Sequence, residues 1–342
     1  MSGAEAGLKP YIARVAAGET LSLDDAGAAF DVIMSGQATA SQLGGFLMAL
    51  AMRGESTDEI AGAARAMRAH MHRMQAPEGA IDIVGTGGDG RRTLNISTAT
   101  ALVVAGCGVT VAKHGNRAAS SQSGAADVLS ALGVDLEADY ATVQRAIDAG
   151  LGFMIAPRYH SAMRHVMPTR VELGARTVFN LLGPLCNPAD VKLYMLGVPA
   201  QRWVEPVARV LGELGAERAW VVHSGDGCDE LTLSAPNLVA VLENGKVTMT
   251  TVSAADAGLP EHPFAAIGGG SPAENAEALA ALLDGAAGAY RDTVLFNAAA
   301  ALIVAGRARE LAQGVALAAQ AIDSGRARAS LDRLVAITTG KG

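Results

Sequence analysis

The chain has 342 residues, half of them hydrophobic, with 34 acidic against 27 basic side chains and a formal net charge of -7. This length and apolar content suffice for a sizeable core in two domains or one large one, which excludes a disordered chain. The acidic balance excludes the broad cationic surface of a protein that grips nucleic acid or an anionic membrane, although a local basic pocket is compatible with it.

The first ten residues contain no cationic region followed by an apolar one. No later run reaches the roughly 20 apolar residues of a membrane-spanning helix. We therefore expect a cytoplasmic protein. Three cysteines, Cys107, Cys186 and Cys228, are odd in number and share no metal-ligand spacing, which is typical of reduced thiols.

Residues 1–75 are expected to form a helical domain. Serine or threonine followed three residues later by an acidic or amide side chain starts a helix with capping hydrogen bonds. Three such pairs precede apolar-periodic segments: Ser22 with Asp25, Thr39 with Gln42, and Ser56 with Glu59. A fourth pair, Ser271 with Glu274, starts a helix near the end of the chain.

From Ile81 onward, short apolar runs alternate with amphipathic segments, which is typical of βαβ units and a mostly parallel sheet. The expected strands are residues 81–84, 109–112, 152–156, 193–198 and 219–223. The expected helices are residues 97–105, 123–132, 140–149 and 203–214. We predict an α/β domain made of residues 76–162 and 189–342, with the helical stretch at about 163–188 joining the N-terminal helices.

The glycine-rich stretch from Gly85 to Gly90 directly follows the first expected strand. It matches the loose GxGxxG pattern, but a dinucleotide site would have an acidic residue about 20 positions later, where residues 110–113 are neutral or basic. Glycine backbone N–H groups can approach phosphate oxygens closely. Asp89 would repel phosphate by itself, so it indicates a cation or an internal hydrogen bond. The alternative is an ordinary glycine-rich turn.

Residues Asn95 to Thr98 stand at the start of the next expected helix. Free N–H groups and hydroxyls there meet the positive end of the helix dipole, which favours an anion. Helix capping alone would also explain Ser97 or Thr98.

The stretch from Lys113 to Ser121 lies between the second expected strand and the next helix. Its lysine, arginine and two serine hydroxyls suit a phosphate monoester or pyrophosphate. Because strand ends of an open α/β sheet converge on one crevice, we expect this loop and the Gly85 loop to hold one doubly phosphorylated ligand. His114 is either a general base or a group that orients a substrate carboxylate.

An acidic stretch from Gly225 to Glu230 follows the strand that ends near His223. Paired carboxylates in a glycine turn suit Mg²⁺, whose octahedral shell takes carboxylate, water and phosphate oxygens. The alternative is an acidic β-turn without a metal.

These four elements, GTGGD at 85–89, NIST at 95–98, KHGNRAASS at 113–121 and DE at 229–230, closely resemble the anthranilate phosphoribosyltransferase family in order and spacing. The similarity continues through residues 170–177, 179–185, 291–292 and 297–299, so it covers nearly the whole chain. Leu94 departs from a frequent phenylalanine of the family and Cys228 from an expected aliphatic residue. Neither departure is expected to touch a ligand group.

The resemblance implies a small N-terminal helical domain plus a larger α/β domain with a mostly parallel central sheet, of the nucleoside phosphorylase and phosphoribosyltransferase type. It also implies a homodimer joined through the helical domains. The implied reaction transfers the phosphoribosyl group of phosphoribosyl pyrophosphate (PRPP) to the amine of anthranilate, in tryptophan biosynthesis. Two Mg²⁺ ions per monomer are implied as cofactors. No nucleic acid or membrane partner is expected.

The resemblance also implies site residues, although it identifies no catalytic residue. Those expected to bind PRPP are Gly85, Gly88, Asp89, Thr93, Asn95, Ile96, Ser97, Thr98, Lys113, His114, Gly115, Asn116, Arg117, Ala118, Ala119, Ser120 and Ser121. Those expected to contact anthranilate or line its approach are Gly85, Asn116, Arg170, His114 and Tyr159. Those expected to hold magnesium are Ser97, Asp229 and Glu230.

Two other functions compete with this interpretation. A pyrimidine nucleoside phosphorylase would share the helical-plus-α/β plan and the lysine-serine loop, but the run from His114 to Asn116 and the acid pair favour the transferase. A non-catalytic relative that binds nucleic acid would need more basic surface than this acidic chain offers.

Overall fold

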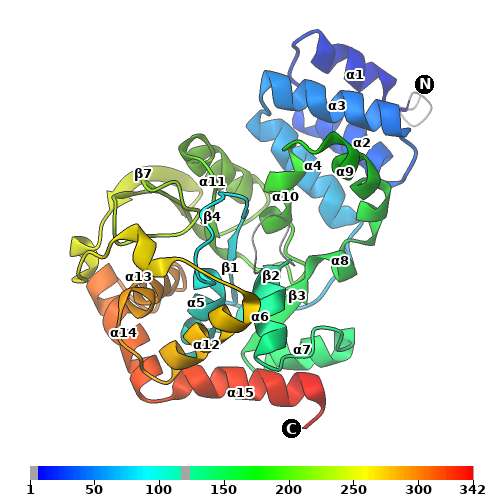
Figure 1. The fold of residues 1–342 in the computed structure, drawn as a ribbon. Coiled ribbons are helices and arrows are strands. Elements are labelled where there is room, and N and C mark those ends of the chain that lie inside the picture. Colours follow the sequence, from blue (N-terminus) through cyan, green and yellow to red (C-terminus); the bar gives the residue numbers. More distant parts are fainter. Residues whose placement is uncertain (1–6, 117–123, 342) are drawn as a thin grey trace.

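The computed structural model describes residues 7–116 and 124–341. It has a small helical domain at the N-terminal end and a larger α/β domain (Figure 1). Among the described residues, no helix combines the length and the apolar character that crossing a bilayer requires.

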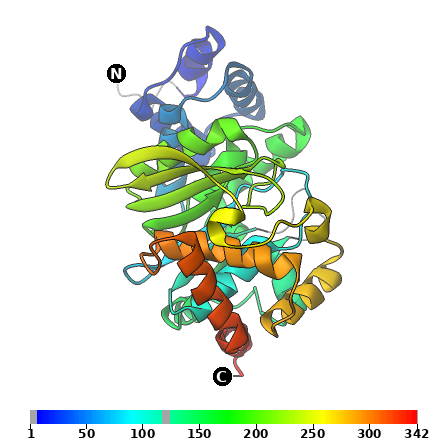
Figure 2. The ribbon, with the colours of Figure 1, turned by 90° about the vertical axis from the view of Figure 1, so that its left-hand side faces the viewer.

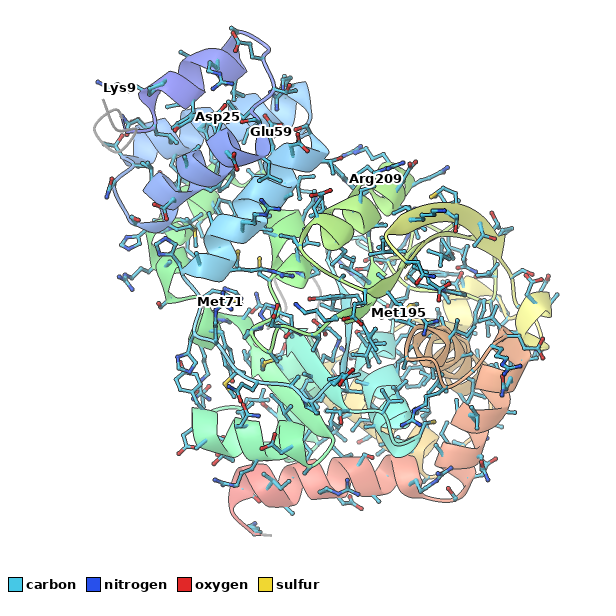
Figure 3. All side chains as sticks on the ribbon, turned by 180° about the vertical axis from the view of Figure 1, so that it is seen from behind. Lys9, Asp25, Glu59, Met71, Met195 and Arg209 are labelled. Atoms are coloured by element: carbon cyan, nitrogen blue, oxygen red, sulfur yellow. The ribbon has the colours of Figure 1, made fainter. Side chains whose placement is uncertain are left out.

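The helical domain contains the first four helices of the described chain. These are α1 (Lys9–Ala16), α2 (Leu23–Met34), α3 (Ala40–Arg53) and α4 (Thr57–Ala69). Reciprocal capping bonds start α3 at Thr39 and α4 at Ser56, as the sequence predicts, and the Ser22 side chain accepts the bond that starts α2. Glu59, labelled in Figure 3, lies buried inside this bundle, where it also accepts the Leu21 N–H at 2.9 Å.

Two short helices from the middle of the chain pack on this bundle. The chain between β3 and β4 forms α8 (Ala156–Tyr159), α9 (Met167–Leu173) and α10 (Phe179–Leu185). Helix α9 contacts α3, and α10 contacts α4 (Figure 1). The rings of Phe30 in α2 and Phe179 in α10 meet edge to face at 5.7 Å. Residues more than a hundred positions apart in the sequence therefore share one core.

The α/β domain is built on one seven-stranded sheet with the order β3-β2-β1-β4-β5-β6-β7. The strands are β1 (Ile81–Gly85), β2 (Val111–Gly115), β3 (Leu151–Ile155), β4 (Leu193–Gly197), β5 (Arg218–Ser224), β6 (Asn237–Glu243) and β7 (Lys246–Val252). The first five are parallel and the last two pair antiparallel. The chain leaves β1 toward β2 and later returns to β4 on the other side of β1, so the carboxyl ends of β1 and β4 form the switch point where such sheets bind ligands.

Helices cover both faces of the sheet. On one side lie α5 (Ile96–Gly106), α13 (Ala289–Val304), α14 (Leu311–Asp323) and α15 (Arg326–Thr339), and on the other lies α11 (Val204–Glu213) beside the helical domain (Figure 2). The remaining helices are α6 (Ala125–Ala131), α7 (Tyr140–Asp148) and α12 (Pro272–Leu283). Because α5 and α13 are almost entirely buried, they lack the amphipathic pattern of surface helices.

Most predicted bounds shift by one or two residues, and two differences have a clear physical reason. Strand β2 begins at Val111, two residues later than expected. Cys107 and Gly108 form the turn that ends α5, and the chain needs Val109 and Thr110 to reach the sheet. The β6–β7 hairpin was not predicted. Its turn contains Asn244 and Gly245 with φ of 52° and 72°, and this Asn-Gly pair is a strong hairpin signal.

Alanine at Gly62 is expected to destabilise the protein, because this glycine lies where α4 crosses α2. A Cβ atom there would lie 2.5 Å from the Leu23 carbonyl oxygen and 2.7 Å from the Gly27 nitrogen. These are backbone atoms, so the two helices would have to separate. Gly62→Ala should lower the free energy of unfolding by about 1–3 kcal/mol, measured by urea denaturation.

The matched control is Gly45→Ala in α3, where a Cβ atom would meet nothing within 4 Å. It should raise the free energy of unfolding by about 0.5–1 kcal/mol through helix propensity. Equal effects of the two substitutions would contradict this account of the α2–α4 contact.

Candidate functional site

Two acidic side chains join three separate loops at the switch point of the sheet. Asp229 and Glu230 lie in the loop between β5 and β6. The Gly87 N–H donates to Asp229 Oδ2 at 2.7 Å, and the Ser97 N–H donates to Glu230 Oε1 at 2.9 Å. The glycine-rich loop, the start of α5 and the acidic loop therefore meet at one place, as the sequence predicts.

Two glycines allow the acidic loop to lie directly against the strand ends. A Cβ atom on Gly85 at the end of β1 would lie 2.5 Å from Asp229 Oδ2. A Cβ atom on Gly197 at the end of β4 would lie 1.5 Å from the Asp229 carbonyl oxygen. Any side chain at either position would push Asp229 out of the crevice.

The acidic groups crowd one another. Carboxylate oxygens of Asp89 and Asp229 and the Cys228 sulfur all lie within 4.8 Å of one another. Burial, as the larger cause, and repulsion from Asp89, as the smaller, raise the pKa of Asp229 to about 7. Burial, followed by repulsion from Asp229, raises the pKa of Glu230 well above its ordinary value. This concentration of oxygen ligands favours a bound cation.

Asp89 also makes the internal hydrogen bonds that the sequence suggested. Its carboxylate accepts the Arg91 N–H at 3.0 Å and the Asp229 N–H at 3.4 Å. Cys228 lies closer to the acids than expected, because the Gly225 to Gly227 turn folds back and the Ser224 N–H donates to the Cys228 carbonyl oxygen at 2.9 Å. Burial raises the pKa of the Cys228 thiol, so this side chain is neutral.

The start of α5 is held from outside the helix. Asn95 is the N-cap residue of α5, but its side chain makes no capping hydrogen bond to the helix. Its side-chain oxygen accepts from Asn275 at 2.9 Å, and its carbonyl oxygen accepts from the Tyr290 hydroxyl at 3.1 Å. Neither Ser97 nor Thr98 caps the helix, so capping does not explain these residues. Just before them, Thr93 forms a bridge with Gly268.

The residues of β2 that lead into the second phosphate-suited loop are buried. Lys113 and His114, both 2 % exposed, lie on β2, and the Lys113 ammonium donates to the Ile83 carbonyl oxygen. Burial lowers the pKa of Lys113, while the charges of Asp82, Glu230 and Asp229 oppose this shift. Gly115 ends β2 and Asn116 follows it, and the predicted residues Arg117, Ala118, Ala119, Ser120 and Ser121 lie outside the described residues.

The His114 side chain lies against a second histidine. Its Nδ1 lies 3.0 Å from the Gly183 carbonyl oxygen, and its Nε2 lies 3.2 Å from His160 Nε2. If Nδ1–H donates to Gly183, His160 must donate to the other ring nitrogen of His114, so two neutral rings satisfy this arrangement. Sequence reasoning missed His160, because nothing near His114 in the chain points to it.

The two remaining predicted residues lie on the segment between β3 and β4. Arg170 on α9 is half-buried, with its guanidinium 5.6 Å from the centre of the Phe179 ring. Tyr159 is 1 % exposed and packs against Tyr140 at 5.4 Å between ring centres. Its position gives it a packing role in this conformation.

Arg176, which the sequence did not single out, connects this segment to the glycine-rich loop. Its Nη1 donates to the Gly88 carbonyl oxygen at 2.7 Å. The contact spans 88 positions of sequence, and no local pattern signals it.

Comparisons with known proteins identify relatives over nearly the whole chain. Residues 77–328 match the model of the glycosyl transferase family a/b domain, and residues 9–71 match its helical bundle domain. The chain is 61 % identical to anthranilate phosphoribosyltransferase of Rhodospirillum rubrum, over 96 % of this chain and 95 % of that protein. It is 58 % identical to the Brucella suis protein of the same name, over 98 % and 99 % of the two chains.

Two solved structures are similar over their whole length. The Thermus thermophilus anthranilate phosphoribosyltransferase superposes with a TM-score of 0.91 at 45 % identity, covering 96 % of this chain and 99 % of that one. The Saccharomyces cerevisiae enzyme in complex with PRPP and Mg superposes with a TM-score of 0.88 at 29 % identity, covering 99 % of each chain.

The neutral histidine pair predicts a loss of stability in mild acid. Burial lowers the pKa of His114 to about 3 and that of His160 to about 4. An unfolded chain binds these protons at about pH 6.5. Stability is therefore full above about pH 6.5 and falls as the pH is lowered toward 4, because only the unfolded chain takes up protons there.

His160→Gln keeps an uncharged hydrogen-bonding group and should remove roughly 2 kcal/mol of the change in unfolding free energy between pH 7 and pH 5. Urea denaturation at both pH values measures this change. An undiminished change in the variant would show that His160 is not held neutral by its surroundings.

Proposed function

The chain belongs to the anthranilate phosphoribosyltransferase family, and we propose that its converging loops bind PRPP and anthranilate. It transfers the phosphoribosyl group of PRPP to the anthranilate amine, giving N-(5-phosphoribosyl)anthranilate and pyrophosphate. This is a glycosyltransferase reaction of tryptophan biosynthesis.

The observation that carries this proposal is the joining of three loops by Asp229 and Glu230. A sugar that carries a phosphate and a pyrophosphate needs several backbone N–H groups and cations at one place. The end of β2 and the loops after β1 and β2 supply a lysine and backbone N–H groups, and the loop after β5 supplies acids that can hold a cation. All three loops start at the same edge of the sheet.

The residues assigned to PRPP come from the glycine-rich loop, the start of α5 and the end of β2. Those within the described chain are Gly85, Gly88, Asp89, Thr93, Asn95, Ile96, Ser97, Thr98, Lys113, His114, Gly115 and Asn116. The assignment is supported by the contacts that bring the glycine-rich loop and the start of α5 against the acidic loop, and by the charge of Lys113 at the end of β2, which acts on Asp229 and Glu230. Residues 117–121 remain a prediction.

The acidic groups fit magnesium. Asp89, Asp229 and Glu230 repel one another, and Lys113 is a cation whose charge acts on Glu230. Carboxylate oxygens are the ligands that Mg²⁺ prefers, and the neutral Cys228 thiol is not. Ser97, Asp229 and Glu230 would hold two ions per monomer. When bound, magnesium supplies positive charge to the departing pyrophosphate.

The protein itself mainly positions the two substrates. An aromatic amine is uncharged at neutral pH, so its attack on the ribose carbon requires no strong base beforehand. His114, with its pKa lowered to about 3, is a weak base and is better suited to orient a substrate group. Gly85, Asn116, Arg170 and His114 are assigned to anthranilate, with the Arg170 guanidinium pairing with its carboxylate. Tyr159, which the resemblance places along the approach of anthranilate, is 1 % exposed and contributes there through packing.

The alternative functions find no support among the relatives. The matched proteins named above are anthranilate phosphoribosyltransferases, and none of these four is a nucleoside phosphorylase or a nucleic-acid-binding protein by name. A Saccharomyces cerevisiae structure with 4-fluoroanthranilate, at 28 % identity and a TM-score of 0.87 over 97 % of this chain and 98 % of that one, agrees with an anthranilate site.

The helical domain is proposed to form a homodimer, in a cytoplasmic enzyme. Met52 at the end of α3 is 82 % exposed, and Val171 on the adjoining α9 is 73 % exposed. The dimer follows from the resemblance to the family, and these two exposed apolar side chains lie on the domain through which the resemblance implies that the subunits join. This surface is shared by residues 1–75 and about 163–188, which we assign to one domain. Light scattering should give twice the monomer mass, and a monomeric mass would contradict the proposal.

Anthranilate fluorescence tests the proposed reaction directly. Purified protein should consume anthranilate only when PRPP and Mg²⁺ are both present, and omission of either should stop the reaction. The double variant Asp229→Asn, Glu230→Gln is the control and should require more Mg²⁺ for the same rate. Phosphorolysis of thymidine or uridine without anthranilate turnover would overturn the assignment.

Replacing Arg170 with alanine tests the anthranilate site. The variant loses a charge-assisted hydrogen bond, so its KM for anthranilate should rise by about tenfold or more, with a smaller effect on the KM for PRPP. Steady-state kinetics with each substrate varied in turn measures both. The matched control is Arg164→Ala, an exposed arginine six residues earlier in the chain. An unchanged anthranilate KM in the Arg170 variant would remove this residue from the site.

A further inference from the structure

The hydrogen-bond ladder between β1 and β2 is interrupted below the site. Strands β1 and β4 pair through all five residues, from Ile81 with Leu193 to Gly85 with Gly197. Strands β2 and β3 likewise pair along their whole length. Strands β1 and β2 form a single pair, Ile81 with Val111. The interruption lies between the two strands whose carboxyl ends lead into the two phosphate-suited loops.

In a continued ladder, Ile83 would lie opposite Lys113 and would be the next residue of β1 whose backbone groups bond to β2. In a parallel ladder of this register, Ile83 N–H would donate to the Ala112 carbonyl oxygen, and His114 N–H would donate to the Ile83 carbonyl oxygen. Three of these four backbone groups, the His114 N–H and the carbonyl oxygens of Ile83 and Ala112, bond side chains instead. His114 N–H donates to Asp82 Oδ1 at 3.1 Å, and the Ile83 carbonyl oxygen accepts from the Lys113 ammonium.

Asn187 completes the replacement from a third segment of the chain. Its side-chain nitrogen donates to the Ala112 carbonyl oxygen at 2.8 Å and to Asp82 Oδ2 at 2.7 Å. Its side-chain oxygen accepts the Ala189 N–H at 2.8 Å. Asp82 and Asn187 are both 0 % exposed, so they form a closed polar junction inside the domain.

We infer that Asp82 and Asn187 are positioning residues that replace the missing β1–β2 ladder and thereby set the spacing between the two loops that bind PRPP. This inference rests on the proposed function. A side chain that stands between a backbone donor and a backbone acceptor separates the strands beyond the about 4.8 Å of directly bonded neighbours. The extra width lies where a bulky phosphorylated ligand must fit between the loops.

The location of the junction favours this role over simple packing. A buried carboxylate and a buried amide cost desolvation, and a continued ladder of backbone bonds would satisfy the same groups without them. Along β1, the replacement occurs only on the β2 side, whereas the β4 side keeps its regular pairs. Asp82 also places a negative charge near Lys113, the ammonium at the base of the second loop.

Asp82→Asn and Asn187→Leu test the inference through substrate binding and kinetics. The amide introduced by the first substitution would face the Asn187 amide with a second donor. The aliphatic side chain introduced by the second would leave both Asp82 and Ala112 without their partner. Each variant should raise the Kd for PRPP, measured by isothermal titration calorimetry with Mg²⁺ present, by about tenfold or more. The KM for anthranilate at saturating PRPP should change less than about threefold.

The matched control is Thr338→Val, remote from the loops, which removes a part-buried hydrogen bond from the Asp135 N–H and a buried one within α15. It should lower the Tm without changing the Kd for PRPP. The inference is overturned if Asp82→Asn and Asn187→Leu bind PRPP within about twofold of the parent chain, even where their Tm is lowered.

Amide hydrogen exchange on the ligand-free protein separates this inference from the proposed function. In Asp82→Asn, residues 83–89 and 112–116 should exchange at least about tenfold faster than in the parent, while β4 and β5 stay protected. Failure of the parent chain to bind PRPP would overturn the proposed function, and the inference with it as stated. Unchanged exchange in these segments would overturn the junction alone, whatever the parent binds.

Discussion

The site depends on two carboxylates that accept backbone hydrogen bonds from other loops. Asp229 and Glu230 hold Gly87 and Ser97 in place, and burial makes their charged forms costly, which raises the pKa of both groups. The same groups therefore organise the loops and create the demand for a cation. Stability and function pull in opposite directions here, because the apo protein would be better served by neutral side chains.

Much of the architecture could be predicted from local patterns. Capping pairs located the starts of α3, α4 and α12, because each capping box lies within four consecutive residues. The five parallel strands follow from their short apolar runs. The rule that the carboxyl ends of parallel strands converge also predicts that loops after different strands meet at one edge of the sheet, as the glycine-rich and acidic loops do. The Asn244-Gly245 turn carried an equally local signal for the β6–β7 hairpin, and it was overlooked.

The parts that could not be predicted are contacts between distant segments. Arg176 reaches Gly88 across 88 positions, and Asn187 reaches Asp82 across 105. Asp82 reads in the sequence as an isolated acid within an apolar strand, and nothing nearby indicates that its partners are the His114 N–H and the Asn187 amide. His160 is hidden in the same way, since its contact with His114 arises only after α8 packs beside the sheet.

The antiparallel pairing of β5 with β6 leaves the length of the acidic loop less constrained than that of the other loops. Parallel strands must be joined by a crossover, usually a helix, whose length is dictated by the sheet. Strand β5 instead returns directly through β6. Residues 225–236 therefore need not contain a helix, and they are held by their own hydrogen bonds. The Asp226 carboxylate accepts from the Thr232 and Ser234 hydroxyls at 2.7 and 2.6 Å. Changes of length in this connection would alter the metal-facing acids while leaving the strand order untouched, so this loop is the place where a related chain could change its chemistry at least cost to its scaffold.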